Sequence, residues 1–113
     1  MTVKNQNFEM FSGDSKTIVV TVTENGTAVD LTGATIKWVV TQLYGKTPEL
    51  YKDTTSGIAV TGAGTFEISL NPADTSLKNG DYYHEARIID ALGHESTVMT
   101  GRITISPSKM PRT

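Results

Sequence analysis

Hydrophobic residues alternate with polar ones in short runs along most of the chain, a pattern typical of β-strands rather than of helices. Glycine, asparagine, aspartate and proline separate the runs, at the spacing expected of an all-β sandwich. We therefore predict many short strands that each bury one face. The clearest inward-facing sets are Ile18, Val20 and Val22; Ile36, Trp38 and Val40; and Phe66, Ile68 and Leu70.

The separators predict the turns. Asn25-Gly26 indicates a tight hairpin because both residues tolerate positive φ. Residues 43 to 48 break the alternation, and Leu50–Asp53 then reads as a short charged edge strand. One helical turn is expected over Pro72–Leu77, with Asn71 as its N-cap and proline at the first helical position.

The segment from Asn71 to Ser106 gives the most complete prediction. After the helical turn, one strand runs from Gly80 through Ile88, Asp90–Gly93 turns the chain, and a second strand carries Met99, Ile103 and Ile105 at alternate positions. We expect this hairpin to form the far edge of the sandwich. Tyr82, near the start of the first strand, is predicted to hydrogen-bond back across the corner.

The length of 113 residues predicts one domain with one core. We expect Trp38 to be the largest side chain in that core. The residues predicted to form the core are Phe8, Ile18, Val20, Trp38, Val40, Phe66, Ile68, Tyr82, Ile88, Ile103 and Ile105.

Composition narrows the classes of function. Ten basic and 12 acidic residues give a formal net charge of -2 without a basic stretch, so we expect no binding of nucleic acid. The chain has no cysteine, which excludes thiolate metal sites and suits synthesis in a reducing cytoplasm. No apolar run resembles a signal peptide or approaches the roughly 20 residues that span a bilayer, so we expect no membrane association.

The two histidines do not predict a metal site. His84 shares the strand period of the inward residues Tyr82 and Ala86, so we interpret it as a core-edge residue. His94 follows a predicted turn, and we interpret it as a solvated loop residue. Zinc needs three or more converging ligands at spacings that this sequence lacks.

Aspartates stand in or beside the predicted turns, where carboxylates could meet loop carbonyls around calcium. Aspartate is also favoured in turns because it caps backbone N–H groups, and no D-x-D-x-D-G loop occurs. We favour the turn role, leave calcium open and predict no cofactor. The residues concerned are Asp30, Asp53, Asp74, Asp81 and Asp90.

Catalytic motifs are missing from the sequence. There is no G-x-S-x-G motif and no nucleophilic cysteine. Glutamates are present, but outward glutamates on alternating strands are typical of a solvated face, and a small sandwich offers little concavity for a substrate. We predict that the protein is not an enzyme.

The order of several segments resembles a known family. They are DLTGATIKW (30–38), GTFEISLNPADT (64–75), LKNGDYYHEA (77–86), and DALG (90–93) followed by STVMTGRITI (96–105). Together they resemble the small immunoglobulin-like β-sandwich proteins of tailed bacteriophages and prophages, which are related to the N-terminal domain of the upper baseplate protein. The resemblance implies a single antiparallel immunoglobulin-like sandwich of about seven to nine strands, which we assign to residues 1–106. Residues 107–113 are polar, proline-containing and basic, so we expect them to form a flexible tail.

The resemblance implies a virion structural protein, in the tail or baseplate, the neck or the capsid surface. Such a subunit acts by protein-protein assembly with other virion proteins, as a homo-oligomer in the particle. The alternative is a glycan-binding or adhesion module, in which Tyr83 with Tyr44 or Tyr51 forms an outer aromatic patch for a cell-surface glycan. The residues predicted to contact partners are Tyr44, Leu50, Tyr51, Lys52, Tyr83, Lys109 and Arg112.

Overall fold

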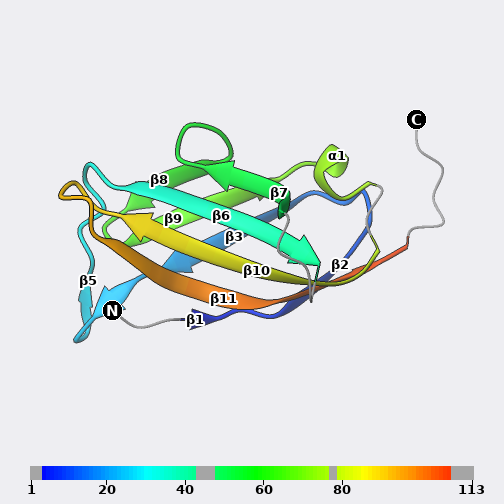
Figure 1. The fold of residues 1–113 in the computed structure, drawn as a ribbon, viewed down its shortest axis with the longest axis horizontal. Coiled ribbons are helices and arrows are strands. Elements are labelled where there is room, and N and C mark those ends of the chain that lie inside the picture. The colour runs from blue at the N-terminus through cyan, green and yellow to red at the C-terminus, as the bar shows by residue number, and fades with distance from the viewer. Residues whose placement is uncertain (1–3, 43–47, 77–78, 108–113) are drawn as a thin grey trace.

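The computed structural model, which describes residues 4–42, 48–76 and 79–107, consists of β-strands and one short helix (Figure 1). In chain order the elements are β1 (Lys4–Asn5), β2 (Phe8–Phe11), β3 (Lys16–Thr21), β4 (Thr23–Glu24), β5 (Thr27–Ala28), β6 (Thr35–Gln42), β7 (Pro48–Asp53), β8 (Ile58–Gly62), β9 (Thr65–Leu70), α1 (Pro72–Thr75), β10 (Gly80–Ile89) and β11 (Glu95–Ser106). Sheet A has the order β1-β11-β10-β6-β7 with β2 also beside β11, and sheet B has the order β3-β9-β8.

The two sheets stack face to face, with sheet A in front of sheet B in Figure 1. Neighbouring strands within the sheets are antiparallel, except that β1 and β2 run parallel to β11. Strands β4 and β5 form a separate small hairpin. The fold is a single immunoglobulin-like β-sandwich, so the predicted fold class is confirmed.

The hairpin of β10 and β11 lies inside sheet A, so the prediction that it forms the far edge was wrong. Strand β10 is flanked by β6 and β11, and the N-terminal strands β1 and β2 cover the other side of β11. Phe8, for example, is paired with Ile103. The local sequence carries no signal for a parallel pairing between the two ends of a chain, and this is why alternation alone did not find it.

The core fills the space between the inner faces of the two sheets. Trp38 and Phe66, from β6 and β9, are the largest of its fully buried side chains. All of the predicted core residues are buried except Phe8, which is partly buried and packs against the core from β2. The period-2 alternation therefore placed the core correctly.

Local turn chemistry also follows the prediction. Asn25 and Gly26 have φ values of 52° and 79° in the turn between β4 and β5. The N–H of Asn71, the N-cap of α1, donates to the Asp74 carboxylate at 2.7 Å. The helix ends at Thr75, and residues 77 and 78, where the predicted turn was to finish, lie outside the described part of the chain.

The start of β10 forms the predicted tyrosine corner. The Tyr82 hydroxyl donates to the Asn79 carbonyl oxygen at 3.1 Å, while the ring is buried. Two residues further on, His84 takes the inward position that alternation assigns to it and is fully buried. In antibody domains, the residue two positions after the corner tyrosine is a cysteine that packs against a tryptophan. In this protein the same position is occupied by His84, whose ring packs against Trp38.

His84, in a single neutral tautomer, connects three parts of the chain by hydrogen bonds. Trp38 Nε1–H donates to His84 Nδ1 at 3.0 Å, so the ring proton lies on Nε2, which donates to the Gln6 carbonyl oxygen at 2.6 Å. Gly101 faces the imidazole across the β10–β11 pair, and a Cβ there would lie 2.1 Å from the Gln6 oxygen. Absence of a side chain at Gly101 is therefore what lets the N-terminal segment reach His84.

Candidate functional site

The outer face of sheet A, the side turned away from sheet B, belongs to the larger of the two stacked sheets. Its residues alternate with the buried ones: on β10, Tyr83, Glu85 and Arg87 point outward between inward neighbours such as His84. Register between strands places these side chains in rows that cross the sheet. Because rows are two residues apart, they are spaced by about 7 Å.

The pairing of β2, β11, β10, β6 and β7 defines five rows, of which the last is Glu95, Ile89 and Thr35. The first row is Glu9, Thr104 and Asp81; the second is Arg102, Tyr83 and Thr41; the third is Thr100, Glu85, Val39 and Tyr51; the fourth is Thr97, Arg87, Lys37 and Asp53.

Two tyrosines, Tyr83 and Tyr51, lie on this face, and alternation along the strand predicts the outward position of Tyr83. The Tyr83 hydroxyl donates to Glu85 Oε1 at 2.9 Å, and the Tyr51 hydroxyl donates to Asp53 Oδ2 at 3.0 Å. Two causes raise the pKa of both phenols: mainly their partial burial, and to a smaller extent the neighbouring carboxylate. Both phenols therefore remain hydrogen-bond donors at neutral pH. Tyr51 is 47% exposed, so its ring is available to a partner.

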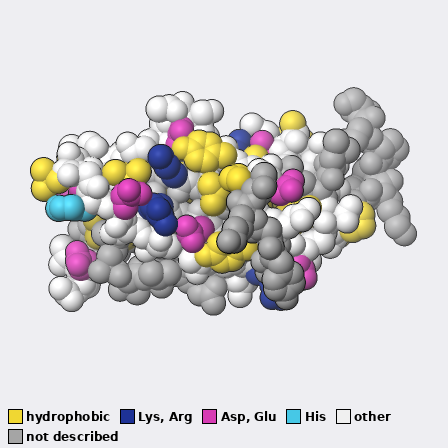
Figure 2. Space-filling model, in the orientation of Figure 1, with side chains coloured by type: hydrophobic (Ala, Val, Ile, Leu, Met, Phe, Trp, Pro, Cys, Tyr) yellow, Lys and Arg dark blue, Asp and Glu magenta, His cyan; other side chains and the backbone are white. Residues whose placement is uncertain are grey.

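Basic side chains lie beside the tyrosines. Arg87 is 3.6 Å from Glu85 and 3.4 Å from Glu95, in ion pairs between partly exposed groups that stabilise a fold by at most about 1 kcal/mol. Figure 2 shows this face, with hydrophobic side chains near its middle over β6, β7 and β10, and charged side chains of both signs beside them. The combination of tyrosine and arginine is typical of protein interfaces.

A shallow hollow of about 700 Å³ runs along β2, β11 and β10 at one end of this face. Tyr83 and Arg102 line it, together with Asn7, Glu9 and Thr100. The Asn7 side-chain oxygen accepts the Arg102 backbone N–H at 2.8 Å, in the interval between β1 and β2. The hollow is open to solvent and holds several hydrogen-bonding groups.

The other predicted contact residues are placed differently. Leu50 is half-buried and packs against the core. Lys52 Nζ lies 2.8 Å from Asp74 Oδ2, with the two side chains 12% and 16% exposed. Tyr44, Lys109 and Arg112 lie outside the described residues. Tyr51 and Tyr83 are thus the members of the predicted contact set that face outward from the described part of sheet A.

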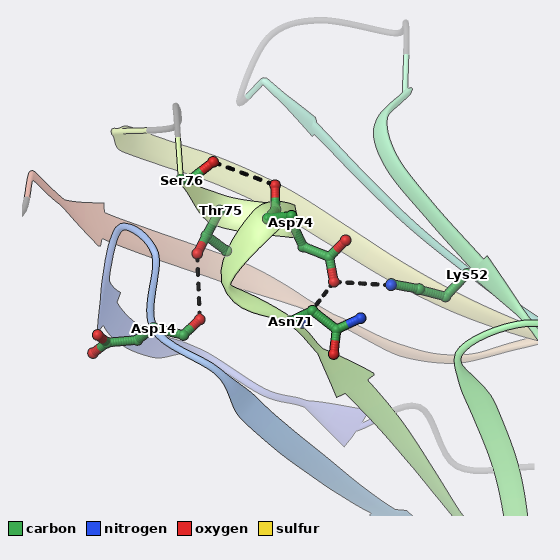
Figure 3. A network of polar contacts seen from close by, with 7 residues as sticks. Asp14, Lys52, Asn71, Asp74, Thr75 and Ser76 are labelled. Carbon is green, nitrogen blue, oxygen red and sulfur yellow. Dashed lines mark hydrogen bonds and ion pairs between the residues drawn. The ribbon is translucent and has the colours of Figure 1, made fainter. Parts of the chain in front are cut away.

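The Lys52–Asp74 pair belongs to a polar network around α1 (Figure 3). On the other side of the helix, Thr75 Oγ1 accepts the N–H of Gly13 at 2.8 Å and lies 3.4 Å from the Asp14 carbonyl oxygen. The network links β7, the helix and the loop before β3. Its polar groups bond to one another, and we interpret it as a structural corner.

The aspartates weighed for calcium have structural partners. Asp30, Asp53 and Asp90 accept hydrogen bonds within their own turns, and these lower the pKa of each carboxyl group; the Thr55 hydroxyl has the largest effect at Asp53, and backbone N–H groups have the largest effect at Asp30 and Asp90. Within residues 4–42, 48–76 and 79–107, no three histidine, aspartate or glutamate side chains gather closely enough to hold a metal ion. The donors are Thr32 for Asp30; Thr55 and Ser56 for Asp53; His94 and Leu92 for Asp90.

His94 lies in an exposed loop, as predicted. Its Nδ1 is 3.3 Å from Asp90 Oδ2, and its side chain is 76% exposed. Asp81 is the second residue of β10, and its carboxylate accepts a hydrogen bond from the Thr104 hydroxyl at 2.9 Å. In the described part of the chain, no helix has the length and apolar character required to cross a bilayer.

Sequence reasoning overlooked several charged residues of the outer face. Lys37, Arg87, Arg102 and Asp81 share this face only through the register of neighbouring strands, which the sequence does not show. The sequence does contain a signal that places these residues on the outer face, which is their alternation with buried residues. Arg102 precedes Ile103, and Arg87 lies between Ala86 and Ile88.

Comparison with known proteins supports the fold and goes no further. No protein-family model and no curated protein matches the sequence. Among solved structures, CopC from Methylosinus trichosporium OB3b is similar at a TM-score of 0.51 and 14% identity, over 98% of this chain and 91% of that one. AggA, the major subunit of aggregative adherence fimbriae type I from Escherichia coli, is similar at a TM-score of 0.38 and 14% identity, over 94% and 99%. At such identity, shared architecture carries no statement about function.

Proposed function

We propose that the protein is a non-catalytic structural subunit that acts by protein-protein assembly, in the virion of a tailed bacteriophage or prophage. The sequence resemblance supplies the biological setting, and the outer face of sheet A carries the argument for assembly. That face presents Tyr51, Tyr83, Arg87 and Arg102 on strands β7, β10 and β11 of the larger sheet. Tyrosine and arginine are the residue types on which binding energy is most often concentrated.

The sheet edges offer a second means of assembly. Strand β7 ends sheet A and β8 ends sheet B, so each has backbone N–H and C=O groups on its outer side that another strand could bind. Both edges carry exposed apolar side chains, Tyr51 on β7 and Val60, which is 45% exposed, on β8. A structural subunit with neighbours in a particle would cover such edges.

The proposal is tested by the state of association of the purified protein and by its binding to particles. Multi-angle light scattering across a wide concentration range should show self-association, or the protein should bind particles that lack it. A tagged subunit should then appear at one repeated position in electron micrographs of the particle. A strict monomer at high concentration that also fails to bind such particles would show the proposal to be wrong.

A glycan-binding module displayed on a particle is the second candidate. The specific observation in its favour is the open hollow lined by Tyr83, Arg102 and Asn7, on the face that also carries Tyr51. An aromatic ring with amide and guanidinium donors beside it is suited to a sugar. A glycan array tests this directly: a signal should be lost in Tyr83→Ala and retained in Glu67→Gln, a change in sheet B. An array without signal, or one unaffected by Tyr83→Ala, would exclude the hollow as a sugar site.

A further inference from the structure

We propose that two copies of this chain pair edge to edge through strand β3, antiparallel, with Val19 of one copy opposite Val19 of the other. The inference rests on the proposed function, since it names a second copy as a partner in assembly and β3 as the contact. Two observations carry it together. Strand β3 is a regular and nearly uncharged sheet edge, and its sequence is complementary to itself.

Strand β3 (Lys16–Thr21) forms one edge of sheet B, and β8 forms the other (Figure 1). The N–H of Val22 donates to the Gly64 carbonyl oxygen at 2.7 Å, which makes these two residues a hydrogen-bonded pair of the antiparallel ladder. Because such pairs alternate along a ladder, the odd-numbered residues of β3 direct their N–H and C=O groups away from β9. Within the residues that the structure describes, no other strand pairs with β3 on that side. The residues with outward-directed groups are Thr17, Val19 and Thr21.

The regularity of β3 distinguishes it from the other edges. Its register with β9 has no shift from Lys16 to Thr21, and Lys16 is its one charged residue. Strand β7 begins with Pro48 and carries three charged residues, β8 has a register shift after Val60, and β2 has four residues, one of them Glu9. Proline, charge, bulges and short length are features by which edge strands limit pairing with another chain. Strand β3 is therefore the edge best suited to a regular pair.

The sequence of β3 matches itself when Val19 is the centre of the antiparallel pair. Val19 then meets Val19 of the other copy, and Thr17 meets Thr21, so that every outward-directed N–H finds a C=O group. Threonine opposite threonine is a favourable cross-strand pair, and β-branched valine packs well on a pleated surface. Val19 is 56% exposed in the single chain, and its symmetry mate would cover it.

The charged residues of sheet B are compatible with this register. Lys16 lies opposite the apolar Val22 of the other copy. Glu67 is the neighbour of Val19 on β9, so the two copies of Glu67 are three strand spacings apart. That separation is about 14 Å, which exceeds the Debye length of about 8 Å at physiological ionic strength.

The charged residues beyond the paired stretch set the response to salt. Continued past the strand, the register would bring Asp14 toward Glu24, but the chain leaves sheet B at both points. The N–H of Asp14 donates to the Phe11 carbonyl oxygen at 3.2 Å, and Glu24 belongs to the hairpin of β4 and β5. Glu9 of β2 points to the outer face of sheet A, away from sheet B. Since the acidic ends repel and no ion pair joins the copies, added salt should not weaken the pair.

The pairing ends at a dimer. A twofold axis through the paired strands uses the β3 edge of both copies, so the association closes. The resulting sheet has the order β8-β9-β3-β3-β9-β8. Each of its outer edges is β8, in which the register shift between Val60 and Gly62 interrupts a regular ladder.

The first test is sedimentation equilibrium, with each variant checked for folding by circular dichroism. Because an edge contact buries less than the about 800 Å² per partner of a standard interface, we expect a wild-type dimer with a micromolar dissociation constant. Val19→Lys and Val19→Glu should each raise that constant about fivefold or more, since like charges then stand opposite each other. An equimolar mixture of the two variants should associate within about threefold of the wild type.

The matched control is Ala59→Lys. Ala59 is exposed on the outer face of the same sheet, but on β8, so this change should leave the dissociation constant unaltered. Amide hydrogen exchange gives a second measurement, because pairing should slow exchange of the Val19 N–H as the concentration rises. The Val20 N–H bonds within sheet B and should be protected at every concentration.

The possible failures are distinguishable from failure of the proposed function. A dimer that tolerates Val19→Lys, or that Ala59→Lys weakens equally, would overturn this inference and leave assembly by another surface intact. A mixture of the Lys and Glu variants that stays as weak as each alone would also overturn it, since Val19 would then not face its own mate. A protein that is monomeric at every concentration would overturn the inference, and the proposed function would then depend on particle binding alone. Protection of the Val19 N–H only in the particle would assign β3 to a strand of a different protein.

Discussion

Acidification should destabilise this protein before its carboxylates begin to titrate, because of His84. The imidazole is fully buried, and both of its nitrogens are used in the neutral tautomer, with Nδ1 accepting from Trp38 and Nε2 donating to Gln6. Protonation would place a second N–H on Nδ1, directed at the Trp38 N–H only 3.0 Å away. Burial accordingly lowers the pKa of His84 below its ordinary value of 6.5.

The sign and size of the effect follow from proton linkage. In the unfolded chain the imidazole binds a proton below about pH 6.5, whereas the folded protein resists binding it. The stabilising contribution of the neutral ring is thus complete above pH 6.5 and is lost as the pH falls toward the lower pKa of the folded state. The free energy of unfolding falls by at most about 1.4 kcal/mol per pH unit in this range. It should therefore be up to about 2 kcal/mol lower at pH 5.0 than at pH 7.5.

Urea unfolding followed by the fluorescence of Trp38, at pH 5.0 to 7.5, measures this loss. His94→Asn removes the exposed imidazole and should retain the full pH dependence. His84→Gln should be less stable at pH 7.5, because the amide cannot match both hydrogen bonds, and its stability should be nearly independent of pH in this range. A free energy of unfolding that is flat with pH in His94→Asn, or that still falls in His84→Gln, would refute the assignment of the effect to His84.

Three further substitutions test the packing. Gly101→Ala should cost about 2 kcal/mol or more in urea unfolding, because its Cβ would lie 2.1 Å from the Gln6 oxygen; an unchanged midpoint would contradict the close approach. Tyr82→Phe should cost about 1 kcal/mol, because it removes the hydrogen bond to Asn79, and a neutral result would show that the corner bond does not contribute. Trp38→Ala should cost roughly 3 to 5 kcal/mol, measured by circular dichroism, and an unchanged melting temperature would mean that the side chain is not in the core.

Features that depend on neighbours in sequence could be predicted from sequence. Alternation over a few residues identified Trp38 as inward and Tyr83 as outward, since successive side chains on a strand take opposite faces. Asn25-Gly26 specified its own turn through the backbone conformations that those residues allow. The hydrogen bond of Tyr82 spans three residues and is similarly local.

Features that depend on distant parts of the chain could not be predicted from the sequence. The sequence indicates an exposed edge lysine at Lys52, and only the folded arrangement brings it to Asp74 of α1. The bond between His84 and the Gln6 carbonyl requires the parallel pairing of the N-terminal strands with β11. The rows of the outer face have the same origin, because a one-residue change of register would give every charge on β10 a different neighbour on β6 and β11.

The parallel pairing of β2 with β11 also determines how the domain would carry mechanical load. Because the two strands run in the same direction, tension applied between the ends of the chain pulls them past each other along their length. The hydrogen bonds between β2 (Phe8–Phe11) and the paired part of β11 (Ile103–Ser106) are then loaded together, in shear. In a hairpin that is peeled open, such bonds break one after another. A domain of this topology is expected to resist stretching strongly when it is pulled from its two ends.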